Sequence, residues 1–236
     1  LFIANMQSGS SLALAGVGIC APITTLITSF TYLICQGASP LFATRLGQKD
    51  YDDAKKIMAN SFLLLVIITV VLMLFFLIFK ESLLYSFGAT PNNFKYASDY
   101  ITIYVLGTFF CLMSLGLNSF ITCQGKSTRA MVTVIIGSLT NILLDYIFIF
   151  PFNMGVKGAA LATIIAQAAS ALFAFSFLIS NKSIVKISFK GYSLKYMKKI
   201  MKIGFCPFII TFTDSVILIV MNKMVSIYAE GNADLY

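Results

Sequence analysis

The sequence predicts an all-α polytopic membrane protein, in which several helices cross the bilayer. Of its 236 residues, 58% are hydrophobic and only 11% are charged, whereas soluble domains are about a quarter charged. Charged residues are also absent from five long windows, at 1–44, 57–79, 100–125, 130–144 and 158–181. A helix needs about 20 apolar residues to cross ~30 Å of hydrocarbon, and each window supplies that length or nearly so. A soluble fold with so few charges could not cover its own surface.

Turn-forming residues divide these windows into separate helices. Pro151 ends the fourth apolar run, and Gly88 and Pro91 lie in the loop after the second. We therefore expect complete spans at 11–36, 57–79, 99–122, 130–150, 158–180 and 203–222. Residues 1–10 are interpreted as the outer end of an earlier span. Because the sequence opens in apolar residues without a methionine or a basic segment, we expect it to be a fragment.

The basic residues predict the orientation in the membrane. The net charge is +8, but the 17 lysines and arginines lie mainly in loops, which argues against a nucleic-acid partner. Loops on one side hold four basic residues in 45–56, two in 126–129 and seven in 181–202. The other side holds four: Lys80, Lys95, Lys157 and Lys223. By the positive-inside rule the first set, including the lysine-rich linker at 181–202, is expected to be cytoplasmic.

Two carboxylates, Asp145 and Asp214, lie within spans apolar enough to enter a bilayer. A charge at the centre of a membrane helix costs at least ~2.5 kcal/mol, so such residues commonly mark ion or proton paths. Ser138 and Asn141 precede Asp145 by seven and four residues, which places all three on one helical face. This face could hold a proton or a small cation. The alternative is a structural carboxylate neutralised by a hydrogen bond.

Other polar residues recur at helical spacing in neighbouring spans. Ser114 and Asn118 are four apart, and Thr163, Gln167 and Ser170 form a stripe on the 158–180 span. Helix-to-helix hydrogen bonding explains Asn141 and Thr163 nearly as well as cation contact does, and Asn118 could cap its helix. A second row on the 158–180 span contains only small residues and predicts close helix packing: Gly158, Ala162, Ala166 and Ser170.

Several segments together resemble the multidrug and toxic compound extrusion (MATE) transporters. They are Gln36-Gly-Ala-Ser-Pro40, Gly47-Gln-Lys-Asp50, Asn118-Ser-Phe, Gln124-Gly-Lys, Asn141-Ile-Leu-Leu-Asp145-Tyr-Ile-Phe and Asn153-Met-Gly-Val-Lys-Gly-Ala-Ala-Leu-Ala-Thr163. The resemblance implies twelve helices in two six-helix lobes around a central cleft. The chain would then contain the amino-terminal lobe without most of its first helix at 1–180, the interlobe linker at 181–202, and helix seven with the start of the second lobe at 203–236.

The same resemblance implies a function. It is secondary active antiport, in which organic cations or amphipathic drugs leave across the plasma membrane in exchange for sodium ions or protons. The family's cation site maps onto Asn118, Asn141, Asp145 and Thr163, and no enzyme activity or cofactor is implied beyond the coupling ion. Asp214 matches no fixed acid of the family and is a candidate cleft residue for cationic substrates. Partners would be the lipid bilayer and the small-molecule substrates, with the full-length protein a monomer.

Three other classes of function fit the sequence less well. A flippase for lipid-linked saccharides, of a related fold, should place basic residues within the cleft to bind pyrophosphate, whereas the charges within these spans are acidic. A channel would need a filter-like repeat, which the sequence lacks. An enzyme would need a nucleophile with a base or a metal cluster, and the chain contains no histidine.

Overall fold

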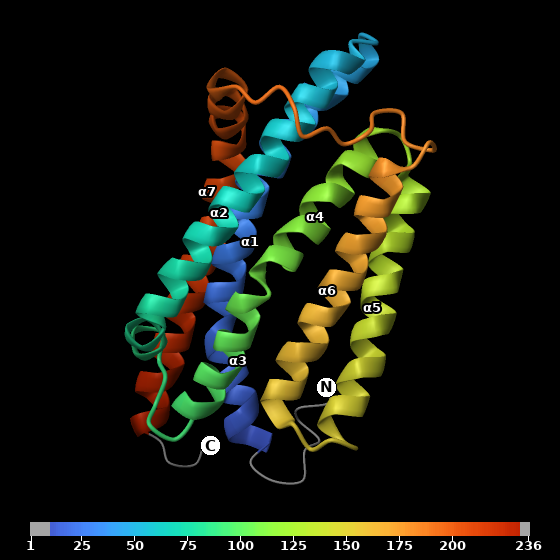
Figure 1. Ribbon diagram of the computed structural model, residues 1–236. Coiled ribbons are helices and arrows are strands. Elements are labelled where there is room, and N and C mark those ends of the chain that lie inside the picture. Colours follow the sequence, from blue (N-terminus) through green and yellow to red (C-terminus); the bar gives the residue numbers. More distant parts are fainter. Residues whose placement is uncertain (1–9, 232–236) are drawn as a thin grey trace.

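The computed structural model describes residues 10–231, which form seven α-helices and contain no strand (Figure 1). The helices are α1 (Ser10–Gly47), α2 (Tyr51–Ser86), α3 (Phe94–Leu106), α4 (Thr108–Cys123), α5 (Ser127–Ile149), α6 (Gly155–Ile179) and α7 (Leu194–Gly231). The predicted all-α fold is confirmed. The interpretation of residues 1–10 falls outside the described residues, apart from Ser10.

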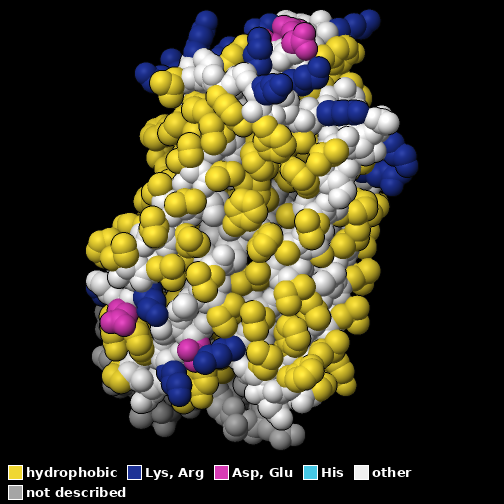
Figure 2. All heavy atoms as spheres, in the orientation of Figure 1, with side chains coloured by type: hydrophobic (Ala, Val, Ile, Leu, Met, Phe, Trp, Pro, Cys, Tyr) yellow, Lys and Arg dark blue, Asp and Glu magenta, His cyan; other side chains and the backbone are white. Residues whose placement is uncertain are grey.

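Five of these helices are long and apolar enough to cross a membrane, namely α1, α2, α5, α6 and α7. The α3–α4 pair makes a sixth span if its two bent halves are counted together. Figure 2 shows a broad belt of hydrophobic side chains, with charged side chains gathered at the two ends of the molecule. The arrangement matches the hydrocarbon core and the two polar faces of a bilayer, so the polytopic prediction is confirmed.

The span predicted at 99–122 is broken into two helices that meet at Gly107 with a bend of 53°. A side chain at this position would overlap the side chain of Ile164 on α6. The absence of a Cβ at residue 107 therefore lets the bend pack directly on α6. The hydropathy of the span does not predict this break, and the contact at Gly107 is with a helix distant in the sequence.

Helix α6 packs against α5 through the predicted row of small residues. Gly158, Ala162, Ala166 and Ser170 are all buried. The Ser170 hydroxyl donates a hydrogen bond to the carbonyl oxygen of Thr133 on α5 at 3.0 Å. Small side chains permit this close approach, which confirms the predicted contact surface.

The three basic loops lie together at one end of the molecule (Figure 1). They join α1 to α2, α4 to α5 and α6 to α7. The linker predicted at 181–202 is non-helical from 181 to 193 and continues as the first turns of α7 from Leu194. This shared placement is what a single cytoplasmic face would require, and the sidedness itself stays a prediction.

Candidate functional site

A cavity of about 220 Å³ lies between α4, α5 and α6, within the apolar belt. Its walls are rich in amide and hydroxyl groups, and none of the described residues that line it is charged. The lining residues are Ser114, Leu115, Asn118, Thr133, Val134, Gly137, Ser138, Asn141, Thr163, Ala166, Gln167 and Ser170. Three of the four predicted cation-site residues, Asn118, Asn141 and Thr163, therefore share one cavity.

Helical periodicity explains how these groups converge. On α4, Ser114 and Asn118 are one turn apart, and on α6 Thr163 and Gln167 are spaced in the same way. Asn141 lies on α5 and faces the cavity between them. Each helix thus contributes a short polar stripe from an otherwise apolar sequence, and the three stripes meet.

Two oxygen atoms at this site are buried and lack a hydrogen-bond partner among the described residues: Oδ1 of Asn118 and Oδ1 of Asp145. A buried polar atom without a partner costs roughly 1 to 3 kcal/mol, so native proteins rarely leave one without a reason. The Thr163 hydroxyl donates its proton to the Ala159 carbonyl at 2.9 Å, and its oxygen also lies within hydrogen-bonding range of the Tyr100 side chain. Oxygen atoms of this kind are the ligands that hard cations prefer.

Asp145 does not line the cavity itself. It is half-buried on α5, one turn beyond Asn141. Tyr100 of α3 lies between the cavity and Asp145. Its side chain is beside Thr163, which lines the cavity, and within electrostatic range of Asp145. Tyr100 is not predicted from the sequence, since one tyrosine among the many aromatic residues of the apolar spans carries no distinguishing pattern.

The structure places Asp214 apart from these residues. Its side chain is exposed on α7 and does not line the cavity. The predicted cluster therefore separates into Asn118, Asn141 and Thr163 around the cavity, Asp145 beside it, and Asp214 elsewhere.

Helices that span the membrane and enclose a polar, oxygen-lined site are characteristic of secondary transporters. The MatE family matches residues 1–147, which is more than half of the chain. The protein therefore belongs to this family, that of the MATE efflux transporters.

Named relatives agree with the assignment. The multidrug export protein MepA of Staphylococcus aureus (strain bovine RF122 / ET3-1) is 25% identical over 219 residues, which cover 92% of this chain and 49% of MepA. A structure of the MATE multidrug transporter DinF-BH has a TM-score of 0.91 and 29% identity, and the match covers 100% of this chain and 52% of that one. An inward-facing MATE family transporter of the MOP superfamily has a TM-score of 0.85 and 27% identity, over 90% of this chain and 49% of that one. The chain thus spans about half the length of the relatives it matches.

Proposed function

We propose that the full-length protein exports organic cations or amphipathic drugs across the plasma membrane in exchange for sodium ions or protons. The coupling cation would bind at Asp145 and at the neighbouring oxygen atoms of Asn118, Asn141 and Thr163. The observation that carries this proposal is the pair of buried oxygen atoms without a partner among the described residues, Oδ1 of Asn118 and Oδ1 of Asp145. The membership of the family and the names of the relatives as multidrug export proteins support the direction of transport.

The chemistry of the site suits a small cation. A carboxylate supplies the charge, while amide and hydroxyl oxygens supply neutral ligands that replace part of the hydration shell. Because the site lies within the apolar belt, little water competes for the ion and the electrostatic attraction is strengthened. A proton on Asp145 would neutralise the same charge, so protons and sodium ions compete for one position.

A lipid-linked saccharide flippase is less well supported. Its pyrophosphate cargo requires lysine or arginine side chains at the site, and the described residues that line the cavity include neither. Cationic or amphipathic cargo agrees better with the carboxylate that lies beside the cavity, Asp145.

The proposal is tested by efflux from cells that express the full-length protein, with sodium concentration and external pH varied separately. We expect export of a cationic dye to depend on an inward gradient of one of the two ions. The 236-residue chain expressed alone serves as the control. Because a central cleft requires both lobes, we expect no export from it. Export that continues after both gradients are abolished would contradict the proposal.

A further inference from the structure

The linker between α6 and α7 is bound along its length by the helices before it. The side chain of Gln124, at the end of α4, is buried, and its Oε1 accepts the N–H groups of Ile184 and Val185 at 2.8 and 3.1 Å. The Ser183 hydroxyl donates to the same oxygen at 3.0 Å, and Nε2 of Gln124 donates to the Val185 carbonyl. One buried amide thus fixes three consecutive linker residues, because it satisfies backbone groups that would otherwise lack partners.

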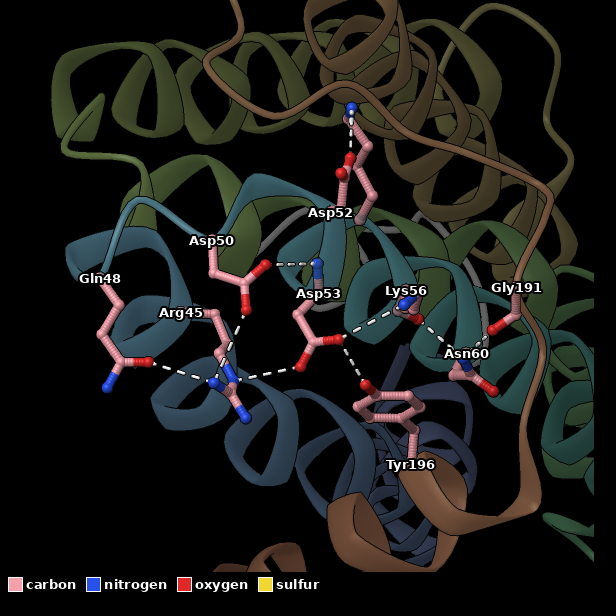
Figure 3. Close-up of polar contacts among 10 residues, drawn as sticks. Arg45, Gln48, Asp50, Asp52, Asp53, Lys56, Asn60, Gly191 and Tyr196 are labelled. Atoms are coloured by element: carbon pink, nitrogen blue, oxygen red, sulfur yellow. Dashed lines mark hydrogen bonds and ion pairs between the residues drawn. The ribbon is translucent and has the colours of Figure 1, made fainter.

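A second buried amide fixes the far end of the linker. Asn60 of α2 accepts the N–H of Ser193 at 2.8 Å. It also donates to the Gly191 carbonyl at 3.1 Å (Figure 3). Asn60 is fully buried. Since Ser193 immediately precedes α7, this pair of bonds holds the chain in place where α7 begins.

The first turn of α7 is then joined to the first turn of α2 and, through Arg45, to the end of α1. The Tyr196 hydroxyl donates to Oδ1 of Asp53 at 2.5 Å, while Nε of Arg45 lies 3.2 Å from Oδ2 of Asp53 (Figure 3). Lys56 adds an ion pair to the same carboxylate at 3.6 Å. The Asp53 side chain is only 17% exposed, so these contacts are shielded from solvent more than an ordinary surface pair. Hydrogen bonds to an ionised carboxylate are stronger than neutral ones.

Helices α1 and α7 approach each other very closely. A Cβ at Gly204 of α7 would overlap the Leu33 carbonyl oxygen of α1, and a Cβ at Gly37 would overlap the Ile200 carbonyl oxygen. Ile200 is fully buried next to this crossing. The backbones are therefore in contact with no side chain between them, and Tyr196 lies about two turns before Gly204 on the same helix.

We propose that the Asp53–Tyr196 hydrogen bond is a latch that keeps α7 against α1 at the loop end of the molecule. Its release lets α7 separate from α1 there. In the full-length transporter α1 and α7 belong to different lobes, so the latch would stabilise the state that is closed at this end. This last step rests on the proposed two-lobe transporter, whereas the effect of the latch on the α1–α7 contact does not.

The test measures how readily a thiol at the crossing reacts. Ile200→Cys is introduced as the sole cysteine of the purified full-length protein in lipid nanodiscs, where both faces are accessible to a maleimide. We expect Tyr196→Phe and Asp53→Asn each to raise the labelling rate about three- to tenfold, as loss of a charge-assisted hydrogen bond implies. The double variant should exceed the larger single effect only slightly, because both changes remove the same bond.

Matched controls separate the latch from general effects. Tyr192→Phe removes an exposed phenol hydroxyl on the same linker, and Asp52→Asn removes the charge of an exposed neighbouring carboxylate. We expect both to label at the parent rate. A second protein whose sole cysteine is the buried Cys111 of α4 reports general unfolding, and its labelling should stay unchanged in the latch variants.

Two results would overturn the proposal. One is labelling of Ile200→Cys in both latch variants within about twofold of the parent, while the denatured protein labels completely. The other is an equal rise at Cys111, which would mean that the variants loosen the whole bundle. Neither result depends on transport, so the proposal can stand or fall separately from the cation site.

Discussion

Asp53 and Asp145 are both acidic side chains on α-helices of this chain, and their surroundings differ in nearly every respect. Asp53 lies at the loop end, where Arg45, Lys56 and Tyr196 all contact its carboxylate. Asp145 lies in the apolar belt, and its buried Oδ1 has no hydrogen-bond partner among the described residues. The first carboxylate is satisfied by the protein itself. The second has unmet capacity, which is what a site for an exchangeable cation requires.

The same contrast holds for the amides around them. Gln124 and Asn60 use both of their polar atoms on the linker backbone. Asn118 leaves a buried oxygen atom without a partner in the described part of the chain. Satisfied amides hold a fold in one arrangement, whereas unsatisfied ones reduce stability and persist where a ligand supplies the missing partner. Substitutions of satisfied and unsatisfied polar side chains should therefore have different effects on stability and export.

The largest expected effect is on export. Asp145→Asn keeps the size of the side chain but removes its charge, and losing one member of a buried charge pair costs on the order of 2 kcal/mol or more. We expect the rate of coupled dye export by the full-length protein to fall about thirtyfold or further, at matched membrane expression. Asp214→Asn is the matched comparison at the exposed carboxylate of α7, and we expect it to reduce export less than Asp145→Asn does. Parent-like export by Asp145→Asn together with loss in Asp214→Asn would identify Asp214 as the essential carboxylate instead.

Next in size is the loss of linker anchoring. Gln124→Leu removes the acceptor for three linker donors and should lower the free energy of unfolding by about 2 to 4 kcal/mol, because buried N–H groups lose their partner. Thermal denaturation of the full-length protein in detergent measures this loss, and limited proteolysis should cut first within 181–193. Gln124→Glu retains the accepting oxygen but loses the donor to the Val185 carbonyl, so it should lose part of this stability but less than Gln124→Leu. Equal losses in the two variants would mean that the accepted bonds are unimportant.

A smaller effect, of opposite sign, is expected at the cavity. Asn118→Leu removes a buried oxygen atom that has no partner among the described residues, so the free energy of unfolding should stay level or rise by about 1 kcal/mol. The same substitution at the satisfied Asn60 should reduce it. Denaturation in the absence of the coupling ion compares the two variants directly. Equal destabilisation at both positions would remove the distinction between satisfied and unsatisfied amides.

The smallest effects concern the neutral ligands. Asn141→Ala and Thr163→Ala each delete one uncharged oxygen, and such intramembrane polar contacts contribute on average ~0.6 kcal/mol. We expect the concentration of coupling ion needed for half-maximal export to rise about threefold in each variant, with folding preserved. If either variant impaired export as strongly as Asp145→Asn does, charge would not be the dominant contribution to cation binding.

The sequence predicts the candidate cation-site residues, but it does not predict the contacts that hold the linker. Asn141 and Asp145 stand out because polar residues in an apolar run are conspicuous, and helical spacing places them on one face. The bonds from Gln124 to Val185 and from Asn60 to Ser193 connect residues 61 and 133 positions apart. Local patterns carry no information about such pairs, so the linker was predicted only from its composition. For the same reason Tyr100 and the bend at Gly107 were not predicted.

The claim that Asp145 holds an exchangeable cation is tested most directly by infrared difference spectroscopy of the full-length protein. Lowering the pH without sodium should produce the carbonyl band of a protonated carboxylic acid. Sodium should diminish that band by competing for the same oxygen atoms. We predict that the sodium-sensitive band is present in the parent and in Asp214→Asn, and absent in Asp145→Asn. A sodium-sensitive band of unchanged size in Asp145→Asn would contradict the claim.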